Sequence, residues 1–166
     1  IRDRKKLFML IVAGFFLASC AATKTEEGGN VDAASTSASS SSGGEITAGT
    51  QEDLIVNVGD RVFFEFDSSE LTVDAQATLD AQAAWLMQYP DTNITVEGHA
   101  DERGTREYNL ALGDKRAFSV YSYLAQAGID TNRMEYVSWG KERPEVIGSD
   151  ETAYSQNRRG VTIVSN

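Results

Sequence analysis

A run of small polar residues near the N-terminus limits how much of this chain can fold. Residues 33–44 read AASTSASSSSGG and contain no aromatic and no large aliphatic side chain. Such a composition cannot bury enough apolar surface to offset the entropy of ordering, and it behaves as a flexible tether. We therefore predict a linker over residues 20–52 and one folded domain of ordinary size over residues 53–166.

Residues 1–19 have the layout of an export signal. Basic residues at positions 2, 4, 5 and 6 precede an uncharged apolar run over 7–18. This run is shorter than the roughly 20 apolar residues that a membrane-spanning helix needs. It ends in LASC, and Cys20 is the single cysteine of the chain, which rules out an intramolecular disulfide. A small buried hydrophobic residue or an unmodified thiol is the alternative role for Cys20.

The LASC junction resembles the signal of bacterial lipoproteins. The resemblance implies that the signal peptide is removed and that Cys20 carries an S-diacylglycerol group and an N-acyl chain. These acyl chains exceed the roughly two that stable membrane anchoring requires. Ala21 follows the cysteine, and by the same resemblance the lack of an aspartate at that position favours the outer membrane, with the domain in the periplasm.

The chain is acidic, which excludes some partners. It holds 25 Asp and Glu residues against 15 Lys and Arg residues, a formal net charge of −10. A general nucleic-acid-binding protein needs a basic face, so we expect no nucleic acid partner. Anionic lipid head groups would repel such a domain, so membrane attachment should come from the lipid on Cys20.

Hydrophobic periodicity after residue 52 predicts strands that alternate with helices. Thr72 is placed to cap the first long helix, Pro90 ends it, and Gly128 suits the end of the second. The order βαβαβ-β implies crossover connections and an α+β fold in two layers, with helices on one face of the sheet. Strands are predicted at 61–66, 93–98, 133–138 and 159–165, helices at 71–89 and 106–127, loops at 99–105 and 141–150, and a helical turn at 152–157.

Two opposite charges are expected at one end of this fold. Asp101 follows a strand in the segment GHADERGT, and ligand sites favour the carboxyl ends of strands in αβ layers. Arg116 is expected on one flank of the second helix, beside Leu112 and away from the core-facing stripe. A guanidinium and a carboxylate that face one pocket would suit a small zwitterion. The alternatives are a structural salt bridge or two unrelated surface charges.

The pattern N-x-x-L-G-x-x-R-A-x-x-V over 109–120 resembles the peptidoglycan-binding signature of OmpA-like C-terminal domains. Further matches follow in order along the domain: FD at 66–67, GHADERGT at 98–105, WGKERP at 139–144 and NRR at 157–159. The resemblance implies a two-layer OmpA-like sandwich with a mixed four-stranded sheet. Arg106 departs from the family pattern, in which proline is commoner at that position.

The same resemblance implies the ligand and the roles of the site residues. The ligand is peptidoglycan, held without a covalent bond through meso-diaminopimelate, whose side-chain end carries an ammonium and a carboxylate. Asp101 would bind the ammonium and Arg116 the carboxylate. We expect either residue to be replaceable by alanine with little loss of stability, and Arg158 and Arg159 to be mainly structural. The residues that would shape the groove are Phe66, Asp67, Asn109 and Leu112.

Lipid-anchored members of this family tether the outer membrane to the cell wall. The resemblance adds TolB and other Tol proteins as partners and a role in envelope integrity and cell division. Stator proteins and porins that share the domain carry a transmembrane helix or β-barrel segments before it. The short signal is the single apolar run found in this chain, so the lipoprotein interpretation is favoured.

A wall-cleaving enzyme is the alternative from another class. His99, Asp101 and Glu102 are close in sequence and would be the residues of a hydrolase. The chain has one histidine and one cysteine, too few for the usual zinc site, and it lacks a G-x-S-x-G motif. A glycosidase that uses carboxylates alone stays open. We expect His99 to orient the loop by hydrogen bonding, and we predict no catalysis, metal or cofactor.

Overall fold

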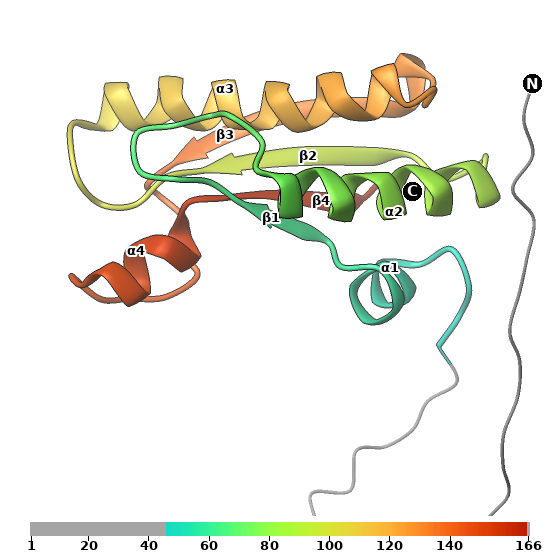
Figure 1. Ribbon diagram of the computed structural model, residues 1–166, viewed down its shortest axis with the longest axis horizontal. Coiled ribbons are helices and arrows are strands. Elements are labelled where there is room, and N and C mark those ends of the chain that lie inside the picture. The colour runs from blue at the N-terminus through green and yellow to red at the C-terminus, as the bar shows by residue number, and fades with distance from the viewer. Residues whose placement is uncertain (1–45, 166) are drawn as a thin grey trace, which may run out of the picture. The chain divides into compact units, whose positions relative to one another are not determined.

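The computed structural model describes residues 46–165, so the predicted signal peptide, Cys20 and most of the predicted linker lie outside the described part. Within it, no helix has the length and apolar character needed to cross a membrane. The elements are α1 (Gln51–Asn57), β1 (Arg61–Phe63), α2 (Val73–Gln88), β2 (Ile94–His99), α3 (Arg106–Gln126), a 3-10 helix η1 (Thr131–Arg133), β3 (Met134–Gly140), α4 (Glu151–Asn157) and β4 (Arg159–Val164) (Figure 1).

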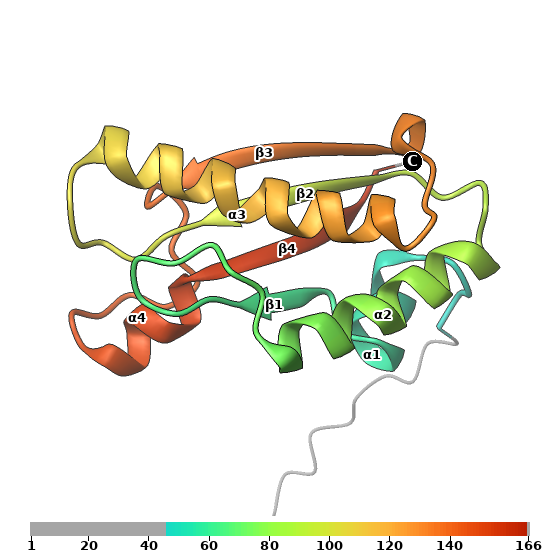
Figure 2. The ribbon, with the colours of Figure 1, turned by 45° about the horizontal axis from the view of Figure 1, so that its top comes forward.

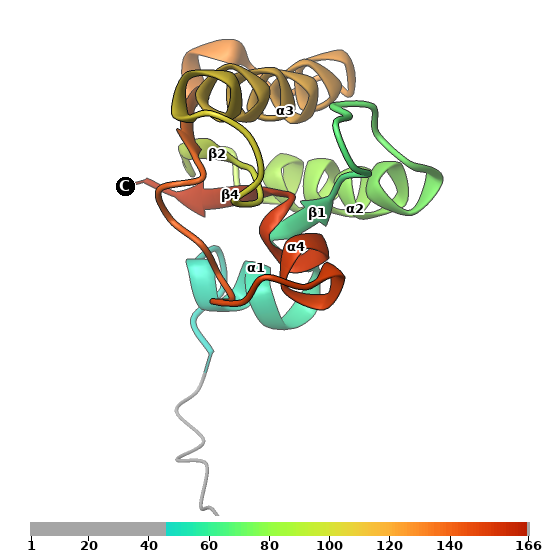
Figure 3. The ribbon, with the colours of Figure 1, turned by 90° about the vertical axis from the view of Figure 1, so that its left-hand side faces the viewer.

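The strands form one mixed sheet in the order β1-β4-β2-β3 (Figure 2). β2 and β3 are parallel, whereas β4 is antiparallel to both of its neighbours. β1 and β2 therefore run in the same direction, and their carboxyl ends meet at one edge of the sheet. The long helices α2 and α3 cover one face, while α1 and α4 lie on the side of β1 and β4 away from α3 (Figure 3). The α+β architecture with a mixed four-stranded sheet is confirmed.

The core lies between the sheet and the two long helices. Leu79 and Leu86 of α2, Val96 of β2, and Val120 and Leu124 of α3 are all at most 1% exposed. Full burial of such a side chain contributes about 1.5–3 kcal/mol. This packing holds the first half of α3 above the carboxyl end of β2, which is where the two predicted charges lie.

The predicted helix ends are confirmed. The Thr72 hydroxyl accepts a hydrogen bond from the backbone N–H of Ala75 at 3.1 Å, as an N-cap does. α2 ends at Gln88, two positions before Pro90. Gly128 follows the end of α3 with a φ of +102°, the left-handed conformation that glycine adopts at little cost.

The helix α1 was not predicted, and the expected domain boundary at residue 53 falls inside it. Asp53 accepts hydrogen bonds from the backbone of Gly49, from the Asn57 amide and from the indole N–H of Trp85 in α2. Leu54 is fully buried in the core. A segment of seven residues gives little periodicity to detect, and these long-range contacts stabilise it instead.

Two glycines let α3 lie directly on the sheet. A Cβ atom on Gly113 would overlap the Ser138 hydroxyl and would lie 2.8 Å from the carbonyl oxygen of Gly98. A Cβ atom on Gly98 would in turn overlap the carbonyl oxygen of Gly113. The helix backbone therefore contacts the strand backbone without side chains between them.

Gly113→Ala is expected to destabilise the protein by about 1–3 kcal/mol, because the added methyl group would push α3 away from β2. Without this clash the substitution would stabilise a helix by up to about 1 kcal/mol. Urea unfolding of the isolated domain measures whether the substitution lowers or raises the free energy of unfolding. An unchanged or higher free energy of unfolding would show that α3 can shift without loss.

Candidate ligand-binding pocket

A pocket of about 210 Å³ opens where β1, β2 and the start of α3 meet. This volume is below the several hundred Å³ typical of drug-sized ligands, so it suits one small head group. Every residue that the sequence predicted for ligand binding lines it, together with three that were not predicted. The lining residues are Phe66, Asp67, Asp101, Arg103, Gly104, Tyr108, Asn109, Leu112 and Arg116.

Arg116 is fully buried beneath the pocket floor. Its Nε donates to the carbonyl oxygen of Ser68 at 2.8 Å, Nη1 to that of His99 at 2.8 Å, and Nη2 to that of Glu65 at 3.1 Å. These bonds use three of the five guanidinium N–H donors, which leaves one donor on each terminal nitrogen for a ligand. Burial lowers the pKa of Arg116 to about 10, so the group is still charged at neutral pH.

The contacts of Arg116 argue against the expectation that its replacement by alanine costs little stability. The side chain ties the loop after β1 to the end of β2 by hydrogen bonds to three backbone carbonyls. Helical periodicity placed Arg116 on the correct flank of α3 but could not show that the loop around Ser68 covers this flank. A binding role and a structural role therefore coincide in one guanidinium.

Asp101 is also buried, at 5% exposed. Its Oδ1 accepts from the backbone N–H and the Nε of Arg103, both at 3.1 Å. Its Oδ2 accepts from Nη2 of Arg103 at 2.6 Å and from Nη1 of Arg158 at 3.4 Å. Burial opposes ionisation of Asp101, but the hydrogen bonds and the charge of Arg103, together with the hydrogen bond from Arg158, lower its pKa below the usual value.

Asp101 forms its ion pairs with Arg103 and Arg158, although it shares the pocket with Arg116. The alternative of a direct salt bridge between the two predicted charges is therefore wrong. Arg158 also donates to the carbonyl oxygen of Phe64 at 3.0 Å and to Glu151 at 2.7 Å. These contacts fit the structural role expected of Arg158.

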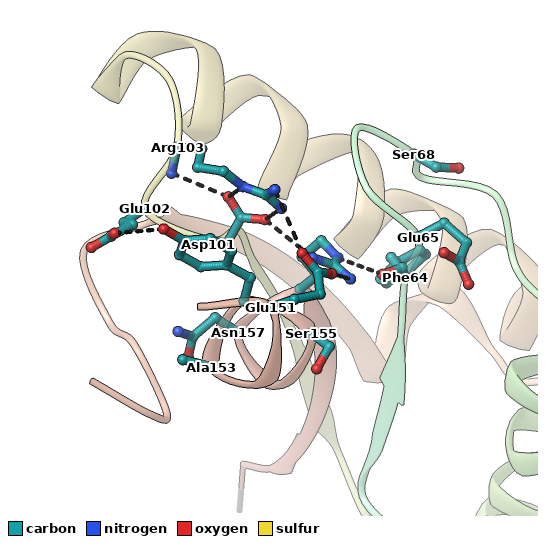
Figure 4. Close-up of polar contacts among 12 residues, drawn as sticks. Phe64, Glu65, Ser68, Asp101, Glu102, Arg103, Glu151, Ala153, Ser155 and Asn157 are labelled. Carbon is teal, nitrogen blue, oxygen red and sulfur yellow. Dashed lines mark hydrogen bonds and ion pairs between the residues drawn. The ribbon is translucent and has the colours of Figure 1, made fainter. Parts of the chain in front are cut away.

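Arg103 was missed as a site residue. Its guanidinium lies between two aromatic rings, 4.2 Å from the centroid of Phe66 and 4.3 Å from that of Tyr154. Its Nη1 is 3.6 Å from a carboxylate oxygen of Glu151. Figure 4 shows Asp101 facing Arg103, with Glu151 close by. The Asn109 amide donates to the backbone carbonyl of Arg103 at 2.8 Å and so fixes this loop to α3.

The loop after β1 closes the pocket from the other side. Asp67 has a φ of +54°, which is uncommon for a residue other than glycine and better tolerated by aspartate than by most. Its carboxylate accepts a hydrogen bond from the Tyr108 hydroxyl, and this bond raises the pKa of Tyr108. The contact holds Asp67 at the rim, as predicted, and Phe66 with Leu112 adds apolar surface beside the charged groups.

The residues of the alternative hydrolase do not converge. His99 lies in β2, not in the predicted loop, and its Nε2 contacts Glu97 at 3.3 Å. Burial lowers the pKa of His99 to about 4, so the ring is neutral at physiological pH. Glu102 instead accepts a hydrogen bond from the Tyr154 hydroxyl at 3.0 Å. Over residues 46–165, no cluster of His, Cys, Asp and Glu side chains could hold a metal ion.

Comparison with known proteins relates most of the domain to one family. The model of the OmpA family matches residues 63–158. A peptidoglycan-associated lipoprotein of Rhizobium meliloti is 56% identical over 121 residues, which cover 73% of this chain and 69% of the relative. The protein of the same name from Brucella melitensis is 55% identical over 122 residues, which cover 74% of this chain and 73% of the relative.

Solved structures agree with this relationship. The crystal structure of the peptidoglycan-associated lipoprotein from Burkholderia pseudomallei is 43% identical, with a TM-score of 0.62 over 64% of this chain and 90% of that chain. The C-terminal domain of Helicobacter pylori MotB shares the fold at 23% identity and a TM-score of 0.59, over 64% of this chain and 84% of that chain. The chain belongs to the OmpA family and, within it, to the peptidoglycan-associated lipoproteins.

Proposed function

We propose that this protein binds peptidoglycan through the head group of meso-diaminopimelate and so holds the outer membrane to the cell wall. It is a binding protein and not an enzyme, in keeping with its family. One observation carries the proposal: the buried charges of Asp101 and Arg116 line the same small pocket but are not paired with each other. Each can therefore serve one end of a zwitterion.

The chemistry of the pocket matches this head group. The ligand ammonium would bind the Asp101 carboxylate. The ligand carboxylate would accept hydrogen bonds from the two remaining N–H groups of Arg116. Phe66 and Leu112 would contact the methylene chain. Charge-assisted hydrogen bonds contribute about 1.5–3 kcal/mol each, so three or four approach the roughly 8 kcal/mol of a micromolar complex.

A titration with two stem peptides tests the proposal. Lysine differs from diaminopimelate in lacking the carboxylate at the side-chain end, so a lysine-containing peptide keeps the ammonium but has no group for Arg116. We expect the soluble domain to bind the lysine peptide at least about 30-fold more weakly than the diaminopimelate peptide, as measured by calorimetry. Equal affinity for both peptides would contradict recognition of the head group by this pocket.

The proposal includes a lipid anchor at Cys20, which lies outside the described residues. A tether of about 30 residues has an r.m.s. span of roughly 30 Å, so an anchored domain would reach the nearby wall at high effective concentration. Weak single contacts would then suffice. TolB and other Tol proteins are the proposed partners, with roles in envelope integrity and cell division.

Cys20→Ala is expected to leave an unacylated precursor that does not partition normally with the outer membrane, because the acidic domain has no electrostatic attraction to anionic lipid that could replace the acyl chains. Fractionation of cells that express each form measures this partition. Normal membrane partition of the variant would argue against the lipid anchor.

A further inference from the structure

We propose that Arg103 is an internal competitor for the ammonium position of the ligand, and that its displacement sets the affinity of the pocket. The inference rests on the proposed function, because it concerns the same pocket. In this role Arg103 opposes binding and does not contribute to it. Its side chain pairs with Asp101 until a ligand ammonium takes its place.

The contacts of Asp101 require such an exchange. Arg103 donates two side-chain hydrogen bonds to the carboxylate, one to each oxygen, at 3.1 and 2.6 Å. Its own backbone N–H and Nη1 of Arg158 supply two more donors. Four donors saturate a carboxylate that is 5% exposed. A ligand ammonium can therefore reach Asp101 only by displacing one of these donors. The donors of Arg103 are the most accessible, because its side chain is 35% exposed and that of Arg158 is 6% exposed.

A second acceptor lies within reach of Arg103. Nη1 of Arg103 is 3.6 Å from Oε2 of Glu151, and the Glu151 side chain is 65% exposed. The Tyr154 ring, 4.3 Å from the guanidinium, lies against the same group. A rotation of Arg103 toward Glu151 would keep its charge paired and keep it on an aromatic surface. The released arginine therefore has a defined alternative position.

Two contacts would keep Asp101 ready for the ligand after Arg103 leaves. The backbone N–H of Arg103 still donates to Oδ1 at 3.1 Å, and the buried Arg158 stays 3.4 Å from Oδ2. Together they hold the orientation of the carboxylate and favour its ionised form. The exchange would therefore involve one side chain and leave the loop backbone in place.

Competition from Arg103 would lower the affinity of every ligand that places an ammonium at Asp101. A bare amine, such as a lysine side chain, gains the contact with Asp101 but must first break a bidentate arginine pair. A zwitterion must break the same pair, and its carboxylate then adds the contact with Arg116. Arg103 would thus weaken the binding of both ligands, and the difference between them would come from Arg116.

Arg103→Met tests the inference, because methionine keeps an unbranched apolar side chain between the rings and removes the competing charge. We expect the variant to bind the diaminopimelate peptide about tenfold more tightly than the native domain, and to bind the lysine peptide more tightly by a similar factor. Arg143→Met is the matched control: Arg143 stacks on Trp139 at 3.3 Å, is 54% exposed, and does not line the pocket. Its affinities should equal those of the native domain.

Glu151→Gln provides a second test of opposite sign, which also serves if Arg103→Met fails to fold. It weakens the alternative position of Arg103, and with it the pair between Glu151 and Arg158, without altering a residue that lines the pocket. We expect severalfold weaker binding of the diaminopimelate peptide. Unchanged or weaker binding by a folded Arg103→Met domain would overturn the inference, as would unchanged or tighter binding by Glu151→Gln. If the native domain binds neither peptide, the proposed function itself fails.

Discussion

Arg116→Ala is expected to lower the free energy of unfolding by about 3 kcal/mol or more and to abolish binding of the diaminopimelate peptide. The substitution leaves three backbone carbonyls beneath the pocket without their donor, and each buried acceptor left unsatisfied costs about 1–3 kcal/mol. For a domain of this size the thermal midpoint should fall by roughly 10–20 °C. Loss of two charge-assisted bonds to the ligand carboxylate weakens binding by about 100-fold or more.

Arg133→Ala separates the two effects. Arg133 also donates to backbone carbonyls, those of Leu86, Tyr89 and Thr92, at 2.7–3.2 Å. It lies before β3 and is absent from the pocket lining. The control variant should lose stability but keep its affinity, measured well below both thermal midpoints. If a folded Arg116→Ala domain still binds like the native one, Arg116 is a structural residue alone.

The sequence predicted the position of the site more accurately than it predicted how deeply the charged side chains of the site are buried. Each motif follows a strand or begins a helix, so topology alone brings 66–67, 98–105 and 109–120 to one edge of the sheet. Burial depends instead on which loop covers which flank. The loop through Ser68 lies over Arg116, and its own sequence gives no sign of this contact. Lysine at this position could not hold three carbonyls and a ligand together.

Arg103 shows a second limit of reasoning from the sequence. It lies two residues after Asp101 in the segment GHADERGT. The sequence therefore predicted that Arg103 is near the site, but not that it pairs with Asp101. An adjacent arginine in a loop can point to solvent or fold back on the aspartate. The rings of Phe66 and Tyr154 decide between these outcomes, and Tyr154 comes from α4, far along the chain. Helix α1 was missed for the same reason, since Trp85 stabilises it from α2.

Asp101→Asn should reduce binding of the diaminopimelate peptide by about 100-fold or more while the domain stays folded. The amide removes the charge that attracts the ligand ammonium. The asparagine also places an NH₂ group where the native carboxylate oxygen accepts a hydrogen bond, so that two donors face each other. Both native oxygens accept from Arg103, and Oδ2 accepts from Arg158 as well. Part of that mismatch falls on the native fold, so we expect the free energy of unfolding to drop by about 1–3 kcal/mol.

Asp53→Asn is the matched control for this loss of charge. Asp53 is buried to a similar degree, at 7% exposed against 5% for Asp101. Its carboxylate accepts from three donors, which come from Gly49, Asn57 and Trp85, where that of Asp101 accepts from four. It belongs to α1 and does not line the pocket. Both variants should unfold at lower urea concentration than the native domain, but only Asp101→Asn should lose affinity. If Asp101→Asn bound the diaminopimelate peptide as tightly as Asp53→Asn does, the Asp101 carboxylate could not be the group that binds the ligand ammonium. The ammonium would then be bound elsewhere.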